Sequence, residues 1–250
     1  MFLEDKKIVV MGVANNKSIA WGCAKALKAQ GATLIYTYQN ERMEKQLAKL
    51  ASPEDLLLEC DVSSDESIRR AFATIEARFG KIDGLVHAIA YSKKEELSGN
   101  ISDVSRDGYA LAQDVSAYSL LAVAKAAKPL LKAGGGIVTL TYMGSERAIP
   151  NYNVMGIAKA ALEAAVRYLA AEFGKIGVHV NAISAGAIKT LAVSGVDGYK
   201  GLIKESDSRT VDGEGVTIDE VGEVAAFLVS PLAAGVVGDI IYVDKGVHLT

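Results

Sequence analysis

Short runs of β-branched and other apolar residues alternate with longer segments of helical period along this chain. We expect strands at Ile8–Gly12, Thr33–Tyr38, Leu56–Asp61, Gly84–Ile89, Gly136–Thr141, Val178–Ala182 and Ile240–Asp244. We expect helices at Ser18–Gln30, Glu41–Ala51, Glu66–Phe79, Asp103–Leu131, Asn153–Phe173 and Ile218–Ser230, three of them closed in a left-handed conformation by Gly31, Gly80 and Gly174. This alternation predicts a doubly wound, Rossmann-like α/β fold, with helices on both faces of a seven-stranded parallel sheet.

Length and composition favour a single domain over residues 1–250. Half of the residues are hydrophobic, so the chain can bury a large core. No tract rich in serine and proline and no block of like charge marks a linker between two domains.

The charge and the cysteine content exclude several classes of protein. The formal net charge is -3 and no basic stripe is present, so we expect no nucleic-acid partner. The two cysteines, Cys23 and Cys60, fall in different expected elements, which suits a reducing cytoplasm better than a disulfide framework. The three histidines, His87, His179 and His248, are too scattered for a metal site, and we expect His87 to be buried in a strand.

No segment of the sequence predicts insertion into a membrane. The most apolar segment, 225–243, is interrupted by serine, proline, glycine and aspartate, so it reads as a helix, a turn and a strand. The first seven residues lack the order of charge followed by an apolar run that a signal peptide has. We therefore expect a cytoplasmic protein.

The candidate site lies where the strands end. In an open parallel sheet, ligands bind outside the carboxyl ends of the strands, at the point where the strand order reverses. The segments that directly follow the expected strands are Gly12 to Ser18, Gln39, Asp61 and Val62, Ile89 to Ser92, Thr141 and Tyr142, and Ser184 to Thr190.

The first of these segments predicts a phosphate-binding turn without the usual glycines. Gly12 is the only glycine before the next helix, so neither a G-x-G-x-x-G motif nor a phosphate-binding loop with G-x4-G-K-[ST] is present. Asn15 and Asn16 tolerate left-handed backbone, and Ser18 can cap the helix, whose free amides could hold a pyrophosphate. A capped turn with no ligand is an equally good reading of this segment.

The ends of the second and third strands bear on the choice of cofactor. Gln39 stands where an acidic residue would normally bind the adenosine ribose, and it can bind the hydroxyls without a charge. The nearest basic residues, Arg42 and Lys45, already lie inside the next helix, so NADH is favoured over NADPH. Asp61 and Val62 suit the adenine edge, although Asp61 could instead cap the following helix.

Tyr152 and Lys159 form the most specific pair in the chain. Seven residues at about 100° each make nearly two helical turns, so the two side chains would share one helical face roughly 10 Å apart along the axis. One could then act on a substrate carbonyl while the other holds a cofactor. Tyrosines at helix starts are often packing residues and such lysines are commonly solvated, which is the competing interpretation.

These residues together resemble a known family. Gly12-x5-Ser18-x-Ala20, Tyr142, Tyr152-x6-Lys159 and the segment 181–186 resemble the NAD(P)H-dependent enoyl-acyl carrier protein reductases of bacterial fatty-acid synthesis, in the short-chain dehydrogenase/reductase superfamily. The resemblance covers essentially the whole chain. Ordinary superfamily members carry tyrosine four residues before lysine, where this chain has Met155.

The resemblance implies hydride transfer from NADH to the β-carbon of a trans-2-enoyl thioester on acyl carrier protein, the last step of type II fatty-acid elongation. Tyr142, Tyr152 and Lys159 would be catalytic: Tyr152 would stabilise the enolate as a neutral donor, and Lys159 would bind the nicotinamide ribose. The implied cofactor-binding residues are Gly12, Ser18, Ile19, Gln39, Asp61, Val62, Ile89, Lys159, Ile188 and Thr190. The implied substrate-binding residues are Tyr91, Ser92, Tyr142, Tyr152, Met155 and Tyr199. The resemblance also implies a homotetramer.

A substrate lid is expected at about 189–206. Apolar residues, among them Tyr199, are interrupted there by three glycines, which suits a flap over a fatty chain, whereas a plain surface helix is the competing view. We also hypothesise that Lys200 and Lys204 meet the acidic carrier protein.

Several positions depart from the family's pattern. Ala90 and Ala187 replace glycine and proline of many members, Lys189 replaces a frequent arginine, and Lys245 a frequent glycine.

Two alternative functions stay open. A short-chain carbonyl reductase acting on 3-oxoacyl substrates would share the fold and cofactor but reduce C=O. A non-catalytic sensor would bind a dinucleotide without carrying out a reaction, because a fold alone does not imply one.

Overall fold

The structure, a computed structural model, describes residues 1–190 and 198–250, except for the side chain at position 199. Within these residues seven strands form one parallel sheet in the order β3-β2-β1-β4-β5-β6-β7. The strands are β1 (Lys7–Met11), β2 (Thr33–Tyr38), β3 (Leu56–Glu59), β4 (Ile82–His87), β5 (Leu131–Thr141), β6 (His179–Ala185) and β7 (Ile240–Val243). The predicted seven-stranded parallel sheet is confirmed.

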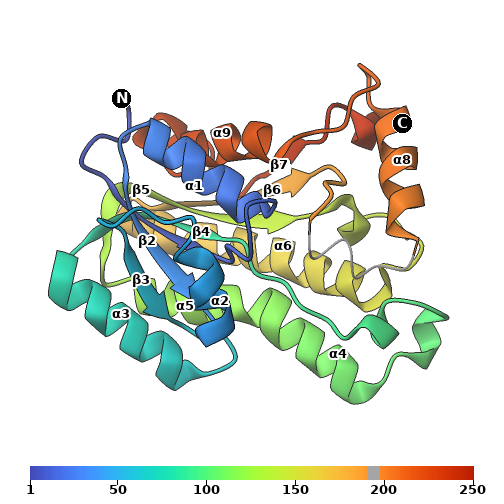
Figure 1. The fold of residues 1–250 in the computed structure, drawn as a ribbon, viewed down its shortest axis with the longest axis horizontal. Coiled ribbons are helices and arrows are strands. Elements are labelled where there is room, and N and C mark those ends of the chain that lie inside the picture. Colours follow the sequence, from blue (N-terminus) through green and yellow to red (C-terminus); the bar gives the residue numbers. More distant parts are fainter. Residues whose placement is uncertain (191–197) are drawn as a thin grey trace.

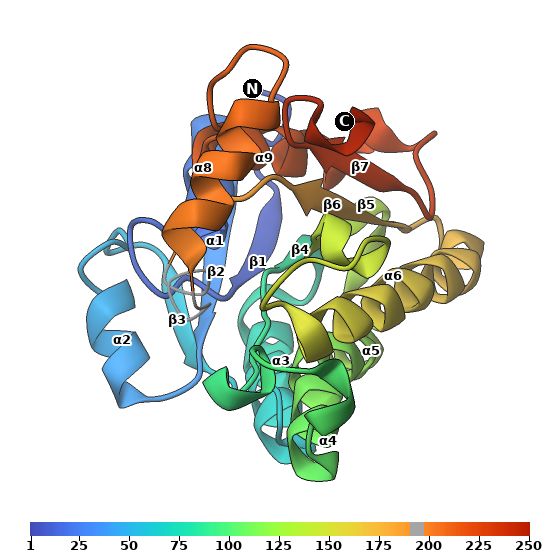
Figure 2. The ribbon, with the colours of Figure 1, turned by 90° about the vertical axis from the view of Figure 1, so that its right-hand side faces the viewer.

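The α-helices connect these strands and cover both faces of the sheet. Their bounds are α1 (Ile19–Ala29), α2 (Glu41–Leu47), α3 (Asp65–Phe79), α4 (Arg106–Gln113), α5 (Ser119–Ala127), α6 (Asn153–Phe173), α8 (Tyr199–Arg209) and α9 (Ile218–Leu228). Helices α1 and α9 lie on one face, and α3, α5 and α6 lie on the other (Figure 1). Figure 2 shows the same two layers after a quarter turn.

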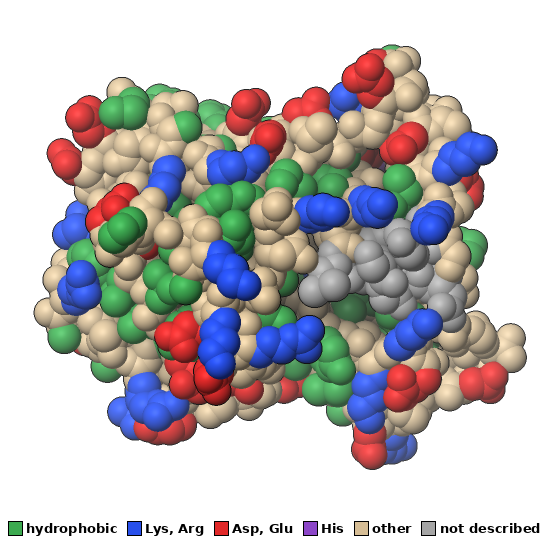
Figure 3. Space-filling view, viewed as in Figure 1, with side chains coloured by type: hydrophobic (Ala, Val, Ile, Leu, Met, Phe, Trp, Pro, Cys, Tyr) green, Lys and Arg blue, Asp and Glu red, His purple; other side chains and the backbone are tan. Residues whose placement is uncertain are grey.

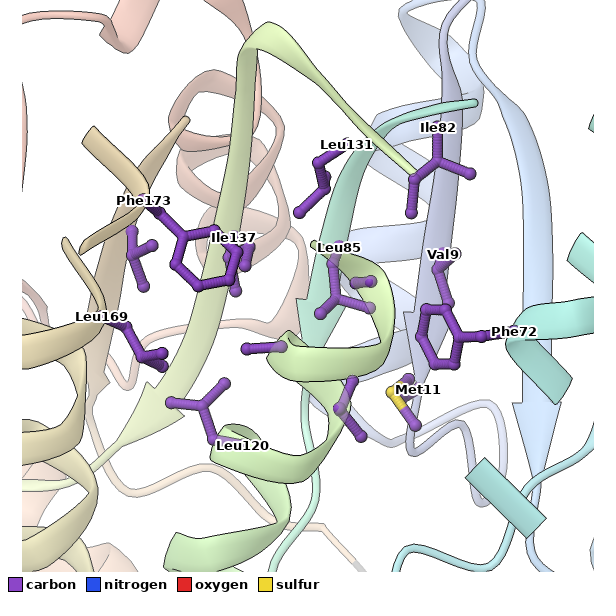
Figure 4. Close-up of a cluster of buried hydrophobic side chains, with 14 of the residues drawn as sticks. Val9, Met11, Phe72, Ile82, Leu85, Leu120, Leu131, Ile137, Leu169 and Phe173 are labelled. Carbon is purple, nitrogen blue, oxygen red and sulfur yellow. The ribbon is translucent and has the colours of Figure 1, made fainter. Parts of the chain in front are cut away.

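Successive residues of β1 point to opposite faces, and each face has its own core. Val9 and Met11 lie beside Phe72 of α3, in the same buried cluster as Leu120 of α5 and Phe173 of α6 (Figure 4). Ile8 and Val10 point the other way and belong to a second core, built with α1 and α9. Because β1 is buried on both faces, it reads in sequence as a continuous apolar run, as a central parallel strand should.

The expected helix Asp103–Leu131 is wrong as one element. Helix α4 ends at Gln113, a π-helical turn follows at Asp114–Tyr118, and α5 begins at Ser119. Two fully buried serines account for the change. The Ser116 hydroxyl accepts from the backbone N–H of Tyr91 and donates to its carbonyl, and the Ser119 hydroxyl donates to the Val115 carbonyl.

Two smaller expectations, the start of β5 and the conformation of Gly174, are also wrong. Strand β5 begins at Leu131, five residues before the expected Gly136. Gly174 has φ -55 and opens a short 3-10 helix, so the left-handed turn lies at Gly177, with φ +74. Gly31 and Gly80 do have positive φ, as predicted.

Among the described residues, no helix is both long and apolar enough to cross a membrane. Cys60 and Cys23 are buried and unpaired. His87 is fully buried in β4, where its ring nitrogens lie 3.0 Å from Thr139 Oγ1 and 2.9 Å from Ser119 Oγ, so the expectation of a buried strand histidine is confirmed.

We predict that Gly22→Ala destabilises the fold through the contact between α1 and α9. A Cβ at Gly22 would lie 2.0 Å from the Ile218 carbonyl oxygen, a backbone atom that cannot move alone. The expected loss is about 2 kcal/mol of unfolding free energy, measured by urea unfolding. Gly174→Ala is the control, because its φ is -55 and no atom lies within 4 Å of the new Cβ. Equal stability of the two variants would contradict this packing.

Candidate active site

The carboxyl ends of β1, β4, β5 and β6 lie side by side at one edge of the sheet. The chain reaches β4 only after crossing from β3 at the far side of β1, so the strand order reverses between β1 and β4. The residues that follow these strands therefore meet at the edge where open parallel sheets bind ligands.

The turn after β1 can pack against the residue that follows β4 only because residue 12 is glycine. Gly12 has φ +94, and a Cβ there would lie 2.0 Å from the Ala88 carbonyl oxygen. The main chain after β1 thus lies directly against the main chain after β4, and any side chain at residue 12 would collide with it.

The start of α1 is not capped by a side chain, which corrects the expected role of Ser18. Its hydroxyl donates to the Asn15 carbonyl at 2.7 Å, so it accepts no bond from the first helical turn. In the described part of the chain, the backbone N–H groups of Ile19 and Ala20 have no acceptor. Asn15 and Asn16 do not adopt positive φ either. Two amides at the start of a helix are thus free to donate to an anion, as a pyrophosphate-binding turn would require.

Gln39 and Asp61 face each other across the ends of β2 and β3. The Gln39 amide nitrogen lies 3.5 Å from Asp61 Oδ2, and Asp61 Oδ1 accepts from the backbone N–H and hydroxyl of Ser63. The cap of α3 is Ser64, which accepts from Ser67, so Asp61 is not the helix cap. Val62 beside it is buried. This corner therefore carries an amide and a carboxylate side by side at the ends of β2 and β3.

Tyr142 and Tyr152 form a T-shaped aromatic pair with ring centroids 5.1 Å apart and an interplanar angle of 72°. Tyr142 directly follows β5, and Tyr152 directly precedes α6. Two glycines let these segments approach. A Cβ at Gly144 would lie 2.5 Å from the Tyr152 ring, and one at Gly156 would lie 2.6 Å from the Gly144 carbonyl oxygen.

Lys159 lies on α6 two turns after Tyr152, and 6% of its surface is exposed. Its Nζ donates to the Leu140 carbonyl at 2.7 Å, so the side chain points at the end of β5 and not into solvent. The interpretation as a solvated lysine is wrong. Met155, between Tyr152 and Lys159, is buried with Leu97 and Val154 in a small apolar cluster.

Burial moves the pKa values of the phenol and the ammonium toward the neutral forms. It raises the pKa of Tyr152 far above its usual range, and Tyr142 and Glu163 add smaller contributions in the same direction. Burial also lowers the pKa of Lys159 to about 8, while Glu163 opposes that change. At neutral pH the site therefore holds a neutral phenol donor and a protonated ammonium.

The remaining expected residues lie on loops around this edge. Ile89 packs partly buried against the core, and Tyr91 is exposed, its main chain anchored to Ser116. Ser92 donates to the Lys93 carbonyl. Ile188 and Thr190 are buried after β6.

Part of the expected lid lies outside the described residues, at 191–197. From residue 199 onward the expected lid is part of helix α8 (Tyr199–Arg209), which agrees with the surface-helix alternative for these residues. The side chain of Tyr199 is outside the described part, so its expected substrate contact stays a prediction. Lys200 and Lys204 are exposed on α8. Over residues 1–190 and 198–250, no group of three or more His, Cys, Asp or Glu side chains could hold a metal ion.

Sequence reasoning missed two side chains that support this edge, Ser116 and Glu163. Nothing in the sequence marks Ser116, because its partner is the main chain of Tyr91. Glu163 had a usable signal: it stands four residues after Lys159, so the two side chains share one face of α6.

Three comparisons with known proteins agree. A family model described as enoyl-(acyl carrier protein) reductase matches residues 12–248. The enoyl-[acyl-carrier-protein] reductase [NADH] of Enterococcus faecalis is 71% identical over the whole of both chains, and one from Staphylococcus aureus, named with NADPH, is 49% identical over 98% of both. The crystal structure of the Bacillus cereus enoyl-acyl carrier protein reductase with NADP+ and indole naphthyridinone superposes with a TM-score of 0.97, at 49% identity, over 100% of this chain and 98% of that one.

We predict that Gly12→Ala weakens binding of NADH more than about tenfold, because the new methyl group collides with the Ala88 carbonyl and displaces the turn. Binding would be measured by fluorescence titration. Gly213→Ala is the matched control, since it has a similar positive φ, +75, but no atom within 4 Å. If both variants bind NADH like the parent, the turn after β1 is not the dinucleotide site.

Proposed function

The chain belongs to the enoyl-(acyl carrier protein) reductase family, and we propose that it uses NADH to reduce the carbon–carbon double bond of trans-2-enoyl-acyl carrier protein, the last step of the fatty-acid elongation cycle. The observation that carries this function is the identity of 71% with an NADH-dependent reductase over the full length of both chains. The paired tyrosines and the buried Lys159, at the edge of the sheet where the strand order reverses, support this function independently.

The corner at Gln39 supports NADH over NADPH. A phosphate on the adenosine ribose would meet the carboxylate of Asp61, 3.5 Å from the Gln39 amide. Lys45, one of the two nearby basic residues, is already paired with Glu41 at 2.6 Å. A ribose with free hydroxyls meets no such repulsion, because both groups can hydrogen-bond to it.

When bound, NADH would supply a hydride to the β-carbon of the enoyl thioester; negative charge would develop on the thioester oxygen, and a proton taken up at the α-carbon would complete the reduction. We assign Tyr152 to donate a hydrogen bond to this oxygen, because its raised pKa keeps the phenol protonated across the working pH range. Lys159 would bind the nicotinamide ribose hydroxyls and add positive potential beside the enolate. Tyr142, whose ring packs edge-on against Tyr152, would fix the direction of the phenol and line the acyl pocket with Met155.

The acidic carrier protein would approach the face shown in Figure 3, where Lys and Arg side chains gather around the middle of the surface. Lys200 and Lys204, exposed one turn apart on α8, are the residues that we assign to this contact. Residues 189–206 would serve as the substrate lid of a single catalytic domain spanning 1–250.

We also propose a cytoplasmic homotetramer. Large apolar side chains are exposed on and beside the outer helices, among them Tyr118, Leu121, Tyr168 and Phe227, and contacts between copies would remove them from water. The reducing cytoplasm suits the two unpaired cysteines.

The reaction is tested by following NADH absorbance with purified protein and two thioesters. We expect oxidation with crotonyl-coenzyme A and none with acetoacetyl-coenzyme A, because Met155, a side chain without a proton to donate, stands where carbonyl reductases carry tyrosine. We also expect a higher kcat/KM with NADH than with NADPH. Oxidation only with acetoacetyl-coenzyme A would identify a carbonyl reductase, and oxidation with neither thioester would favour a sensor.

The two assigned roles predict different kinetic defects. Tyr152→Phe removes a hydrogen bond made to the developing charge, so kcat should fall about 100-fold while the Kd for NADH stays unchanged. Lys159→Ala should weaken NADH binding and lower kcat together. Tyr109→Phe, on α4 and 43% exposed, is the control and should behave like the parent. Unchanged turnover in Tyr152→Phe would remove that residue from the mechanism.

A further inference from the structure

Leu140 and Thr141 at the end of β5, and Tyr142 directly after it, contact α6 or the residue that precedes it. The Leu140 carbonyl accepts from Lys159 Nζ at 2.7 Å, and the Thr141 hydroxyl donates to Glu163 Oε1 at 2.6 Å. Tyr142 then packs against Tyr152. Two of these contacts involve residues of the proposed mechanism, whereas the contact between Thr141 and Glu163 has no role in it.

Glu163 is an unusual residue for its position. It is 6% exposed, and its neighbour Leu162 and the next residue on this face, Val166, are fully buried core residues. Placing a carboxylate there costs free energy that one hydroxyl does not recover. Among the described residues, no Lys, Arg or His lies within 4.0 Å of the Glu163 carboxylate, so it is not one half of a direct ion pair.

The ammonium of Lys159, one helical turn before Glu163, has the opposite problem. Lys159 is as buried as Glu163, and among the described residues its ammonium has one acceptor, the neutral carbonyl of Leu140. Neither buried charge is fully compensated by its own hydrogen bond. The ammonium of Lys159 and the carboxylate of Glu163 can each supply the opposite charge that the other needs. In agreement with this, burial lowers the pKa of Lys159 to about 8, and Glu163 raises it.

Four other titratable side chains near Lys159 and Glu163, namely His87, Tyr142, Tyr152 and Tyr242, are uncharged at neutral pH. On β4, burial and the charge of Lys159 lower the pKa of His87 to about 3, so its ring is neutral. Burial raises the pKa values of Tyr142 and Tyr152, and both remain phenols. On β7, Tyr242 donates to Glu146 at 2.9 Å, and its pKa is raised to about 12.

We propose that Glu163, held in place by the Thr141 hydroxyl, is a positioning residue that maintains the positive charge on Lys159 where the nicotinamide ribose binds. This inference rests on the proposed function, because it takes Lys159 as the ribose-binding residue. Glu163 itself touches neither cofactor nor substrate and acts through Lys159. Its carboxylate stabilises the protonated amine through space, and Thr141 fixes the distance at which it does so.

The sign of the expected pH dependence follows from the amine. Lys159 is charged below its pKa and neutral above it, so NADH binding should weaken as the pH rises through about 8. Removing the Glu163 charge favours the neutral amine and moves this loss of affinity to lower pH. A purely structural role of Glu163 would weaken binding by a similar factor at every pH.

The test is the Kd for NADH between pH 6 and pH 10, followed by quenching of the single tryptophan, Trp21, which lies on α1. For the parent protein we expect Kd to rise with a midpoint near pH 8. In Glu163→Gln, which keeps the shape of the side chain, the midpoint should fall by about one pH unit. Thr141→Val should shift it in the same direction by less, and Thr141→Ser, which keeps the hydroxyl, should restore the parent midpoint.

A double variant separates the proposed coupling from general damage. In Lys159→Arg the guanidinium stays charged throughout this range, so adding Glu163→Gln should not move any loss of NADH affinity to lower pH. Unchanged midpoints in both Glu163→Gln and Thr141→Val, with NADH still bound, would overturn the inference and leave the proposed function standing. Absence of NADH binding by the parent protein would instead contradict the proposed function.

Discussion

The hydrogen bond from the buried ammonium of Lys159 to the Leu140 carbonyl is the contact on which the site depends. It fixes the first turns of α6 against the last residues of β5, and the Tyr142 and Tyr152 rings meet beside it. The close approach is possible because Gly144 and Gly156 have no side chains there. The segment 140–159 therefore places helix α6, the end of β5 and the two tyrosine rings next to one another.

Burial gives this edge its chemistry. A phenol kept neutral by desolvation can only donate to an anion that forms next to it, and an ammonium with a pKa near 8 is charged at neutral pH but costly to keep charged. The carboxylate of Glu163 offsets that cost without pairing directly with Lys159, whose hydrogen bonds stay available for a ligand. Preorganised charges in a dry environment act more strongly than the same charges in water.

Regular elements could be predicted where one pattern dominated. Strand β2 and helix α6 have the predicted bounds, Thr33–Tyr38 and Asn153–Phe173, because a β-branched run and a long helical period are unambiguous. The π-helical turn at Asp114–Tyr118 could not be predicted, since the buried Ser116 hydroxyl bonds to the main chain of Tyr91, 25 residues earlier in the sequence. The role of Ser18 was mispredicted for a local reason, because its hydroxyl donates to the Asn15 carbonyl, three residues earlier, instead of capping α1. In the site, the spacing of Tyr152 and Lys159 was readable from the sequence, while the carboxylate behind the lysine became visible only when β5 was placed beside α6.

The most direct test of this account is a crystal structure with oxidised cofactor and a non-reducible acyl thioester analogue. The account predicts that Lys159 Nζ lies within about 3.2 Å of the nicotinamide ribose hydroxyls, and that the Tyr152 hydroxyl lies equally close to the thioester oxygen. A structure in which Lys159 bonds only to Leu140, or in which the Tyr152 hydroxyl points away from the acyl group, would contradict it.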